Sequence, residues 1–251
     1  MINLSGKVAV VTGGARGIGR SCCLLMAQAG ARVIVNYRKN VAAARHTVEE
    51  IQSQGGEAAA AQADVSRPEA CRELLRESAR QFGGIDILVN NAGIWKEAPV
   101  EKMTDEQWDE TMAINLRGPF LCCREAIPYL KARETGRIIN ISSTAGQRGE
   151  PLHSHYAASK GALQSFTKSL AVELAPHRIT VNCVAPGWIA TDMCEEPFRG
   201  EGRKAIESGI PLGRVGRPEE IAATVLFLAS SLSSYLTGEI INVNGGSVLC
   251  G

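Results

Sequence analysis

Three polar residues near the middle of the chain have the chemistry for proton transfer at a carbonyl or alcohol oxygen. Tyr156 and Lys160 are four residues apart, so both project from one face of a helix. A phenol has a pKa of ~10, and a neighbouring ammonium favours the phenolate and lowers that pKa toward neutral pH. Ser143 precedes Tyr156 by thirteen residues, at the end of a predicted strand, where its hydroxyl can bind the substrate oxygen. These residues predict general acid–base catalysis.

A glycine-rich segment comes directly after the first predicted strand and directly before a helix. It reads Gly13-Gly14-Ala15-Arg16-Gly17-Ile18-Gly19, which is a G-x-x-x-G-x-G spacing. Glycines at such a turn allow backbone N–H groups and the helix N-terminus to face a pyrophosphate. The spacing differs from the G-x-G-x-x-G of the standard dinucleotide fingerprint. Its position between strand and helix still predicts a dinucleotide-binding loop.

Short apolar runs alternate with longer helical segments along the chain. Apart from a few polar residues, the runs are continuously apolar, as in strands that are buried on both faces of a parallel sheet. A third strand is placed at Glu57–Ala63 on topology, because that segment is mostly alanine. This order predicts a single-domain α/β Rossmann fold over residues 1–251, with a doubly wound seven-stranded parallel sheet and helices on both faces. The other predicted strands are Val8–Val11, Val33–Val35, Ile87–Val89, Ile138–Ile141, Thr180–Val184 and Ile240–Val243.

Six helices are predicted between the strands. Good helix formers at helical period mark them, and some open with an N-cap signal such as Ser66-Arg67-Pro68-Glu69. A segment at about residues 190–212 is the exception, because it is rich in Glu, Gly and Pro and has weak periodicity. Such a long connection predicts a lid or substrate loop. The predicted helices are Gly19–Ala29, Ala42–Gln54, Pro68–Phe82, Asp105–Glu134, Tyr156–Ala175 and Pro218–Ser230.

The composition excludes several classes of protein. Lys and Arg number 27 against 26 Asp and Glu, so there is no general electrostatic case for binding nucleic acid or an anionic membrane. No apolar run reaches the ~20 residues of a membrane helix, and the first residues lack the pattern of a signal peptide. The eight cysteines form no C-x-x-C pair, and the histidines are not at zinc-ligand spacing. We expect a cytoplasmic α/β protein with reduced thiols and no metal site.

In order and in context, the motifs resemble those of the short-chain dehydrogenase/reductase family, and most of all its 3-oxoacyl-[acyl-carrier-protein] reductases. The glycine loop, Asn90-Asn91-Ala92-Gly93, Ser143 and Tyr156-Ala157-Ala158-Ser159-Lys160 carry this resemblance. It implies an NAD(P)-dependent oxidoreductase that interconverts a carbonyl and a secondary alcohol by hydride transfer. It also implies that Asn115 is catalytic beside Ser143, Tyr156 and Lys160, because it helps to hold a proton-relay water. The cofactor-binding residues that it implies are Gly13, Arg16, Gly17, Ile18, Gly19, Tyr37, Arg38, Asp64, Val65, Asn91, Ala92, Gly93, Tyr156, Lys160, Pro186, Gly187, Ile189 and Thr191.

The end of the second strand predicts which nicotinamide cofactor is used. In family members that prefer NAD, a carboxylate at this place binds the ribose 2′-hydroxyl, and here Tyr37 takes its place. Arg38 and Arg16 are both positioned to reach the adenosine end, where a guanidinium suits the geometry of a phosphate. The resemblance therefore implies NADP, with NADPH preferred over NADH.

The sequence leaves the substrate open between a small carbonyl or alcohol compound and an acyl carrier protein thioester. The carrier-protein reductases have basic residues on the face that docks the carrier. At two of those places this chain has Glu134 and His177, with Arg133 and Arg178 beside them as candidate contacts. A carrier would need these bases beside the mouth of the active site.

Other features favour alternatives. A histidine just before the tyrosine, as at His155, resembles the pattern of the sugar dehydrogenases. The functions of a sugar or polyol dehydrogenase and of a general ketone reductase therefore remain open alternatives. With no carboxylate or cysteine at ligand spacing, His153 and His155 are expected in the substrate pocket or in solvent. A dinucleotide-sensing protein without activity is disfavoured, because it would be expected to lack Tyr156 or Lys160. The resemblance also implies a homotetramer, with the predicted helices at 105–134 and 156–175 pairing across an interface.

Overall fold

One seven-stranded sheet organises residues 2–249, the part of the chain that the computed structural model describes. The strand order is β3-β2-β1-β4-β5-β6-β7, and every neighbouring pair is parallel. The predicted doubly wound sheet is confirmed, including its alanine-rich third strand. The strands are β1 Val8–Val11, β2 Arg32–Tyr37, β3 Ala58–Gln62, β4 Ile87–Asn90, β5 Gly136–Ile141, β6 Ile179–Pro186 and β7 Ile240–Val243.

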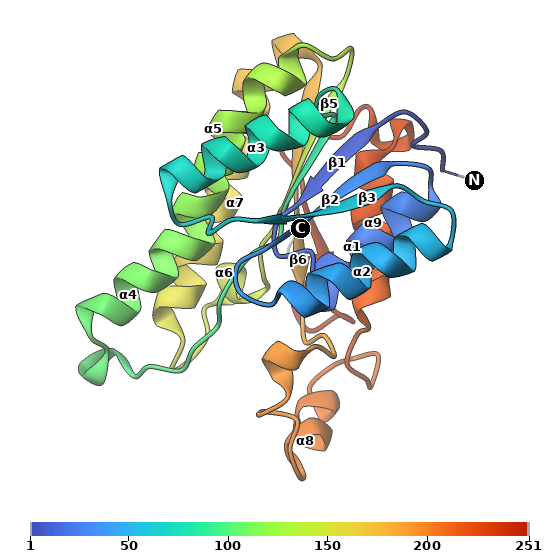
Figure 1. Ribbon diagram of the computed structural model, residues 1–251. Helices are drawn as coiled ribbons and strands as arrows, with labels where there is room; N and C mark the ends of the chain where they lie inside the picture. Colours follow the sequence, from blue (N-terminus) through green and yellow to red (C-terminus); the bar gives the residue numbers. More distant parts are fainter. Residues whose placement is uncertain (1, 250–251) are drawn as a thin grey trace.

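Helices cover both faces of the sheet (Figure 1). One apolar core lies between the sheet and α1, α2 and α9, and a second lies between the sheet and α3, α5 and α7. No helix within residues 2–249 has the length and apolar character needed to cross a membrane. The α-helices are α1 Gly17–Gln28, α2 Val41–Ser53, α3 Pro68–Phe82, α4 Asp105–Met112, α5 Gly118–Lys131, α6 Ala145–Arg148, α7 Ser154–Leu174, α8 Gly202–Ser208 and α9 Pro218–Ala229.

The central strands form because they are apolar on both sides. Every residue of β1, β4 and β5 is buried, as expected for a parallel sheet between two helical layers. The edge strand β3 has little apolar surface of its own and depends on its neighbour. It pairs with β2 from Val33 opposite Ala58 to Tyr37 opposite Gln62. The buried side chain of Asn36 also donates to the carbonyls of Ala61 (3.1 Å) and Ala63 (3.2 Å), which fixes the end of β3 beside β2.

The prediction of one continuous helix over residues 105–134 is wrong. A capping box between Thr104 and Gln107 starts α4, but residues 113–117 form a π-helix before α5 begins at Gly118. Asn115 lies in this π turn, and its buried amide makes hydrogen bonds to Ile94 and Ser159. Turns of this kind are often found at functional sites. The interruption therefore places Asn115 between the end of β4 and α7.

The strand order reverses between β1 and β4, so the loops after these two strands part at the carboxyl edge of the sheet. In doubly wound proteins this is where ligands bind. The predicted substrate loop extends from the same edge after β6. It contains a short 3₁₀-helix at Asp192–Cys194 and then α8, which protrudes from the body of the molecule (Figure 1). A β-bridge between Ile189 and Gly216 closes the base of this loop.

Candidate active site

A cavity of about 440 Å³ opens at the carboxyl ends of the strands. Its volume is within the range of small-molecule and cofactor sites. Every predicted catalytic and cofactor-binding residue lines it except Gly19 and Asn115, which lie behind its wall. The cavity also reaches side chains that the sequence analysis assigned no role. They include Trp95, Arg148, Glu150, Trp188, Met193 and Cys194.

The glycine loop forms the floor of the cavity between β1 and α1. Gly13 and Gly17 have φ values of +64° and +52°, which other residues rarely adopt. A Cβ atom on Gly19 would lie 2.3 Å from the Gly13 carbonyl oxygen, so only glycine allows the first turn of α1 to approach the loop this closely. Although Gly19 does not line the cavity, it is needed for the shape of the loop. The loop therefore presents backbone and a helix N-terminus to the cavity, as a pyrophosphate requires.

Two polar residues that the sequence analysis missed brace this loop. Thr12 Oγ1 accepts the backbone N–H groups of Asn91 (3.0 Å) and Ala92 (3.1 Å), and Asn91 Nδ2 donates to the Thr12 carbonyl at 2.9 Å. Asn36 Oδ1 accepts the N–H of Gly13 at 3.2 Å. Each is a polar residue at the end of a buried apolar strand, and that position was the signal available in the sequence.

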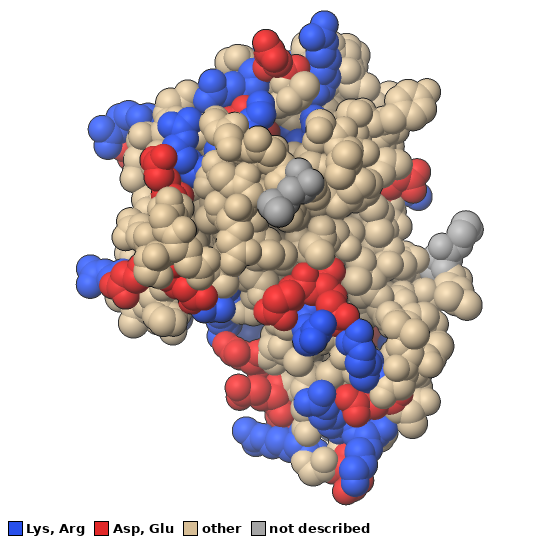
Figure 2. Space-filling model, turned by 90° about the vertical axis from the view of Figure 1, so that its right-hand side faces the viewer, with Lys and Arg blue, Asp and Glu red and all other residues tan. Residues whose placement is uncertain are grey.

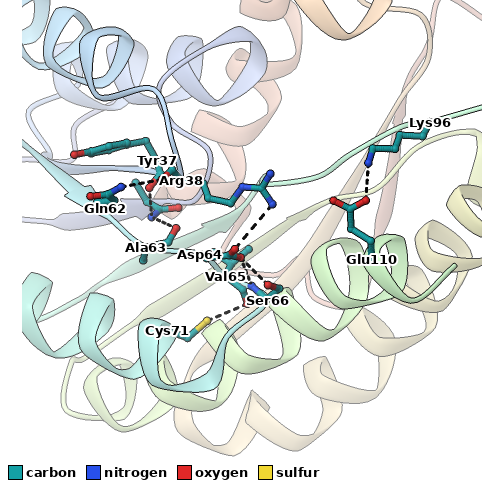
Figure 3. A network of polar contacts seen from close by, with 11 residues as sticks. Tyr37, Arg38, Gln62, Ala63, Asp64, Val65, Ser66, Cys71, Lys96 and Glu110 are labelled. Atoms are coloured by element: carbon teal, nitrogen blue, oxygen red, sulfur yellow. Dashed lines mark hydrogen bonds and ion pairs between the residues drawn. The ribbon is translucent and has the colours of Figure 1, made fainter. Parts of the chain in front are cut away.

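The end of β2 and the loop after β3 line the part of the cavity where the sequence predicts the adenosine of the cofactor (Figure 3). Arg38 Nη1 lies 3.9 Å from Asp64 Oδ2, and Ser66 donates to Asp64 Oδ1 from its backbone N–H (3.0 Å) and from Oγ (2.7 Å). Burial opposes ionisation of Asp64, but the Ser66 hydrogen bonds and the charge of Arg38 outweigh it and lower the pKa of the carboxyl. The guanidinium of Arg38 reaches toward Asp64, while the ring of Tyr37 extends to the other side. Tyr37 occupies the position at which family members that prefer NAD have a carboxylate.

Ser143, Tyr156 and Lys160 come together at the opposite end of the cavity. Lys160 Nζ donates to the Ile141 carbonyl at the end of β5 (2.7 Å) and lies 5.7 Å from the centre of the Tyr156 ring. Ser143 follows β5, and its Oγ accepts the N–H of Ala145 at 3.1 Å. The predicted geometry, with two residues on one face of a helix beside a serine at a strand end, is present in the structure.

The pKa values of this group are set mainly by burial. Desolvation lowers the pKa of Lys160 to about 8. Desolvation raises the pKa of Tyr156 well above its usual value, and the hydrogen bond with Ser143 opposes that rise. The sequence analysis expected the ammonium to bring the Tyr156 pKa down toward neutrality, and the protein groups by themselves do not do this. With its proton retained, the Tyr156 phenol is suited to donate to a developing alkoxide.

Asn115 supports the catalytic group from behind. Its side chain is fully buried, with Oδ1 accepting the N–H of Ile94 at 2.9 Å and Nδ2 donating to Ser159 Oγ at 3.2 Å. A Cβ atom on Gly93 would lie 3.3 Å from Asn115 Oδ1 and 3.5 Å from Lys160 Nζ. A side chain at Gly93 would therefore crowd both groups, and glycine lets the segment after β4 pack closely against them.

The two histidines before Tyr156 have different surroundings. His153 stacks on Trp95 with ring centres 4.2 Å apart and planes 4° from parallel. His155 is fully buried, and neither of its ring nitrogens has a hydrogen-bond partner within residues 2–249. The expected place of His155 in the pocket or in solvent is therefore wrong. Among the described residues, no group of three or more potential ligands could hold a metal ion.

The lining of the cavity suits a nicotinamide dinucleotide. It includes a glycine loop that presents backbone N–H groups, as a pyrophosphate requires, the bases Arg16 and Arg38, and Lys160 beside Gly93. Fold and site together define an oxidoreductase of the dinucleotide-dependent α/β class. The chain belongs to the short-chain dehydrogenase/reductase family.

Comparisons with known proteins show this membership over nearly the full chain. A family model described as Enoyl-(Acyl carrier protein) reductase matches residues 13–247. A 3-oxoacyl-[acyl-carrier-protein] reductase of Synechocystis sp. is 43% identical over 250 residues, which cover 99% of this chain and all of that protein. Versicolorin reductase 1 of Aspergillus parasiticus is 42% identical, with 97% of each chain covered. A solved dehydrogenase/reductase from Sinorhizobium meliloti 1021 superposes with a TM-score of 0.94 at 42% identity, covering 98% of this chain and 97% of that one.

Proposed function

We propose that this protein is an NADPH-dependent reductase of 3-oxoacyl thioesters, which converts the 3-carbonyl to a secondary alcohol. The observation that carries the proposal is the convergence of Ser143, Tyr156 and Lys160 at one end of a dinucleotide cavity. The names of relatives that are about 42–43% identical over nearly the whole chain support the substrate class.

The residues divide the chemistry between them. When bound, the reduced cofactor supplies the hydride. The Ser143 hydroxyl donates a hydrogen bond to the substrate oxygen and holds it beside Tyr156, and the Tyr156 hydroxyl gives its proton to that oxygen as negative charge develops. Lys160, held by the Ile141 carbonyl, binds the nicotinamide ribose and adds positive charge near the phenol. Asn115 holds the segment around Gly93 and, as the family resemblance implies, a proton-relay water.

The family description names an enoyl reduction, whereas the curated relatives above are named as 3-oxoacyl reductases. The site favours the second reaction. Ser143 and Tyr156 both offer a hydroxyl at the same end of the cavity, and two donors that converge on one oxygen stabilise an alkoxide directly. In the reduction of an enoyl thioester the negative charge develops instead as an enolate on the thioester oxygen, which is on the carbon two positions away from the one that receives the hydride.

The choice of NADP rests on the adenosine end of the cavity. Arg16 and Arg38 both line it, and both are partly exposed, so each guanidinium can turn toward a 2′-phosphate. Tyr37 offers no carboxylate to bind a ribose hydroxyl or to repel a phosphate. These features support NADPH over NADH.

The carrier-protein contacts expected from the sequence do not flank the site within one chain. Arg133 precedes β5, whereas Ser143 follows it, so six strand residues at ~3.3 Å each, about 20 Å, separate the two ends. Arg133 also donates to the Gly83 carbonyl at 2.6 Å and lies 3.7 Å from the buried Asp86, which indicates a structural role. Arg178 precedes β6 at the same far edge. The expectation that both bases lie beside the mouth of their own site is therefore wrong.

The surface around the substrate loop supports only a modest preference for a carrier protein. Acidic and basic side chains are interleaved over the part of the molecule that carries α8 (Figure 2). Several of them neutralise one another, as in the ion pairs Arg203–Glu207 and Arg214–Glu220. Steering of an acidic carrier helix requires a field of one sign. We expect thioester reduction with a smaller carrier advantage than a dedicated fatty-acid enzyme has.

One kinetic comparison tests the proposal. NADPH oxidation is followed with a 3-oxoacyl group on N-acetylcysteamine and on acyl carrier protein, at low and high salt, beside ketones, sugars and steroids. Reduction of both thioesters, with kcat/KM values within about tenfold of each other and a weak salt dependence, is expected. Activity on a sugar with none on either thioester would replace this function with that of a sugar or polyol dehydrogenase. A strong, salt-sensitive carrier preference would contradict the limited carrier advantage.

A homotetramer is part of the proposal. Large apolar side chains stay exposed on α4, α5 and α7: Trp108 and Phe120 are 41% and 42% exposed, and Val172 is 77% exposed. Phe120 also packs against Phe166 of α7, so these two helices share an apolar patch. Light scattering after size exclusion, with Phe120→Glu to disrupt this face, tests the assembly. We further propose a cytoplasmic location, which fits the use of six cysteines as buried thiols.

A further inference from the structure

A carboxylate occupies the substrate end of the cavity without an ion-pair partner. Glu150 lines this end, and its Oε2 accepts the indole N–H of Trp95 at 3.1 Å. Within residues 2–249 it forms no ion pair and receives no other side-chain hydrogen bond. Burial is the largest cause of the raised pKa of Tyr156, and the charge of Glu150 adds to it. The carboxylate therefore acts at the reacting centre. The acid–base mechanism does not use it.

The position of Glu150 is fixed by its neighbours. Trp95 holds the carboxylate on its indole N–H and is itself stacked on His153. His153 Nδ1 lies 3.0 Å from the Pro151 carbonyl oxygen. The Leu152 carbonyl accepts the N–H of Ala98 at 2.8 Å, although Leu152 has the unusual φ of +63°. Two segments of the chain are thus tied together, and they hold the carboxylate in place before a substrate arrives.

The chemistry of this arrangement defines what it can bind. Glu150 is partly exposed, and a carboxylate only accepts hydrogen bonds, so its free lone pairs are open to donors from a ligand. Trp95 supplies one donor to Oε2, which leaves Oε1 for a ligand. The Trp95 and Trp188 rings, at 5.9 Å and 89° to each other, give the same end of the cavity apolar walls. A second negative charge brought beside Glu150 would be repelled.

We infer that Glu150, held by Trp95, is a specificity-determining residue that selects uncharged substrates with a hydrogen-bond donor near the reacting carbonyl. The inference rests on the proposed carbonyl reduction and narrows its substrate class. The donor is either an amide N–H, as in the arm of an acyl thioester, or a hydroxyl, as in a hydroxyketone. Anionic oxo acids are excluded by the same carboxylate.

Two substrate pairs that differ in a single donor test the inference. The first pair is the 3-oxobutanoyl thioester of N-acetylcysteamine and its analogue with an ester oxygen in place of the amide N–H. The second pair is hydroxyacetone and methoxyacetone. For each pair the ratio of kcat/KM values is measured with NADPH in the unmodified protein, in Glu150→Gln and in Glu150→Met. Glu97→Gln is the matched control, because Glu97 is an exposed carboxylate two residues from Trp95.

The unmodified protein is expected to prefer the donor in at least one pair by about tenfold or more, the effect of a hydrogen bond to a charged group. Glu150→Met should reduce that preference to less than about threefold, Glu150→Gln should give an intermediate value, and Glu97→Gln should leave it unchanged. Glu150→Gln should also raise kcat/KM for acetoacetate relative to its ethyl ester by about tenfold. Unchanged cofactor affinity and circular dichroism confirm that the variants are folded.

The outcomes separate this inference from the proposed function. Reduction of the thioesters with the same donor preference in all variants overturns the role of Glu150 and leaves the proposed function standing. Reduction of hydroxyacetone alone, with a preference that depends on Glu150, overturns the thioester function and supports the inference. No reduction of either pair overturns both.

Discussion

The side chain of Asn115 makes with Ile94 the two hydrogen bonds that a neighbouring strand would make. Its Oδ1 accepts the Ile94 N–H and its Nδ2 donates to the Ile94 carbonyl, both at 2.9 Å. The same Nδ2 also donates to Ser159 Oγ at 3.2 Å. One buried amide therefore joins the segment after β4 to the π-helix and to α7. Because Gly93 and Trp95 flank Ile94, this amide positions both Gly93, which lies close to Lys160, and Trp95, which holds Glu150.

We predict that Asn115→Ala lowers the free energy of unfolding as well as turnover. The substitution removes three hydrogen bonds and leaves the partly buried backbone groups of Ile94 without their side-chain partner, which should cost about 2–4 kcal/mol. Urea denaturation measures the loss, and Asn3→Ala, at an exposed asparagine that accepts a local bond from Ser5, is the control. Lost turnover with unchanged stability would assign Asn115 a purely chemical role.

Tyr156→Phe should lower kcat for carbonyl reduction by at least ~10²-fold, because a positioned proton donor contributes roughly 10²–10⁴. The dissociation constant of NADPH should change little, since only one hydroxyl is removed. Steady-state kinetics and a fluorescence titration of the cofactor measure the two effects. Tyr235→Phe, at a fully exposed tyrosine, serves as the control. Turnover of the Tyr156 variant within a fewfold of the unmodified value would refute the proposed proton donor.

NADPH should bind more tightly than NADH, and removal of a 2′-phosphate contact should lessen the difference. Arg16→Ala or Arg38→Ala should weaken NADPH binding by about tenfold or more and leave NADH binding nearly unchanged. Tyr37→Asp should shift the preference toward NADH, because a carboxylate binds the ribose hydroxyl and repels a phosphate. Isothermal titration calorimetry gives the constants, with Arg45→Ala on the exposed face of α2 as control. Equal affinities for both cofactors in the unmodified protein would contradict the assignment of NADP.

Cofactor affinity should fall as the pH rises through about 8. Burial lowers the pKa of Lys160 to about 8, so its ammonium is present below that pH and is lost above it. Tyr156 does not titrate in this range, because burial raises its pKa well above the usual value. NADPH dissociation constants between pH 6 and pH 9.5 should show this step, and Lys160→Met should lack it.

The same ionisation should affect folding in the opposite direction. An unfolded lysine has a pKa of ~10.4, so between pH 8 and that value the unfolded chain binds more protons than the folded chain at this position. The contribution of Lys160 to the free energy of unfolding therefore increases with pH in this interval. A Lys160-dependent fall in the free energy of unfolding over this pH interval would show that the pKa of Lys160 is not lowered.

Much of the fold is encoded in short stretches of sequence. The central strands are continuous apolar runs, and α3 is delimited by Pro68 at its start and by Gly83, with φ +79°, at its end. The glycine loop and the pairing of Tyr156 with Lys160 are equally local, because helix geometry alone places residues i and i+4 on one face. These features depend on neighbours in the chain, so they could be predicted without a structure.

The other features of the fold and of the site were decided by contacts between segments that are distant in the sequence. The helix predicted over residues 105–134 is interrupted where Asn115 bonds to Ile94, 21 residues away in the chain. Glu150 becomes part of the site only because Trp95, 55 residues away, holds it there. Helical period and propensity contain no information about such partners. The same is true of the Lys160 pKa of about 8, which results from desolvation by packed neighbours and therefore exists only in the folded protein.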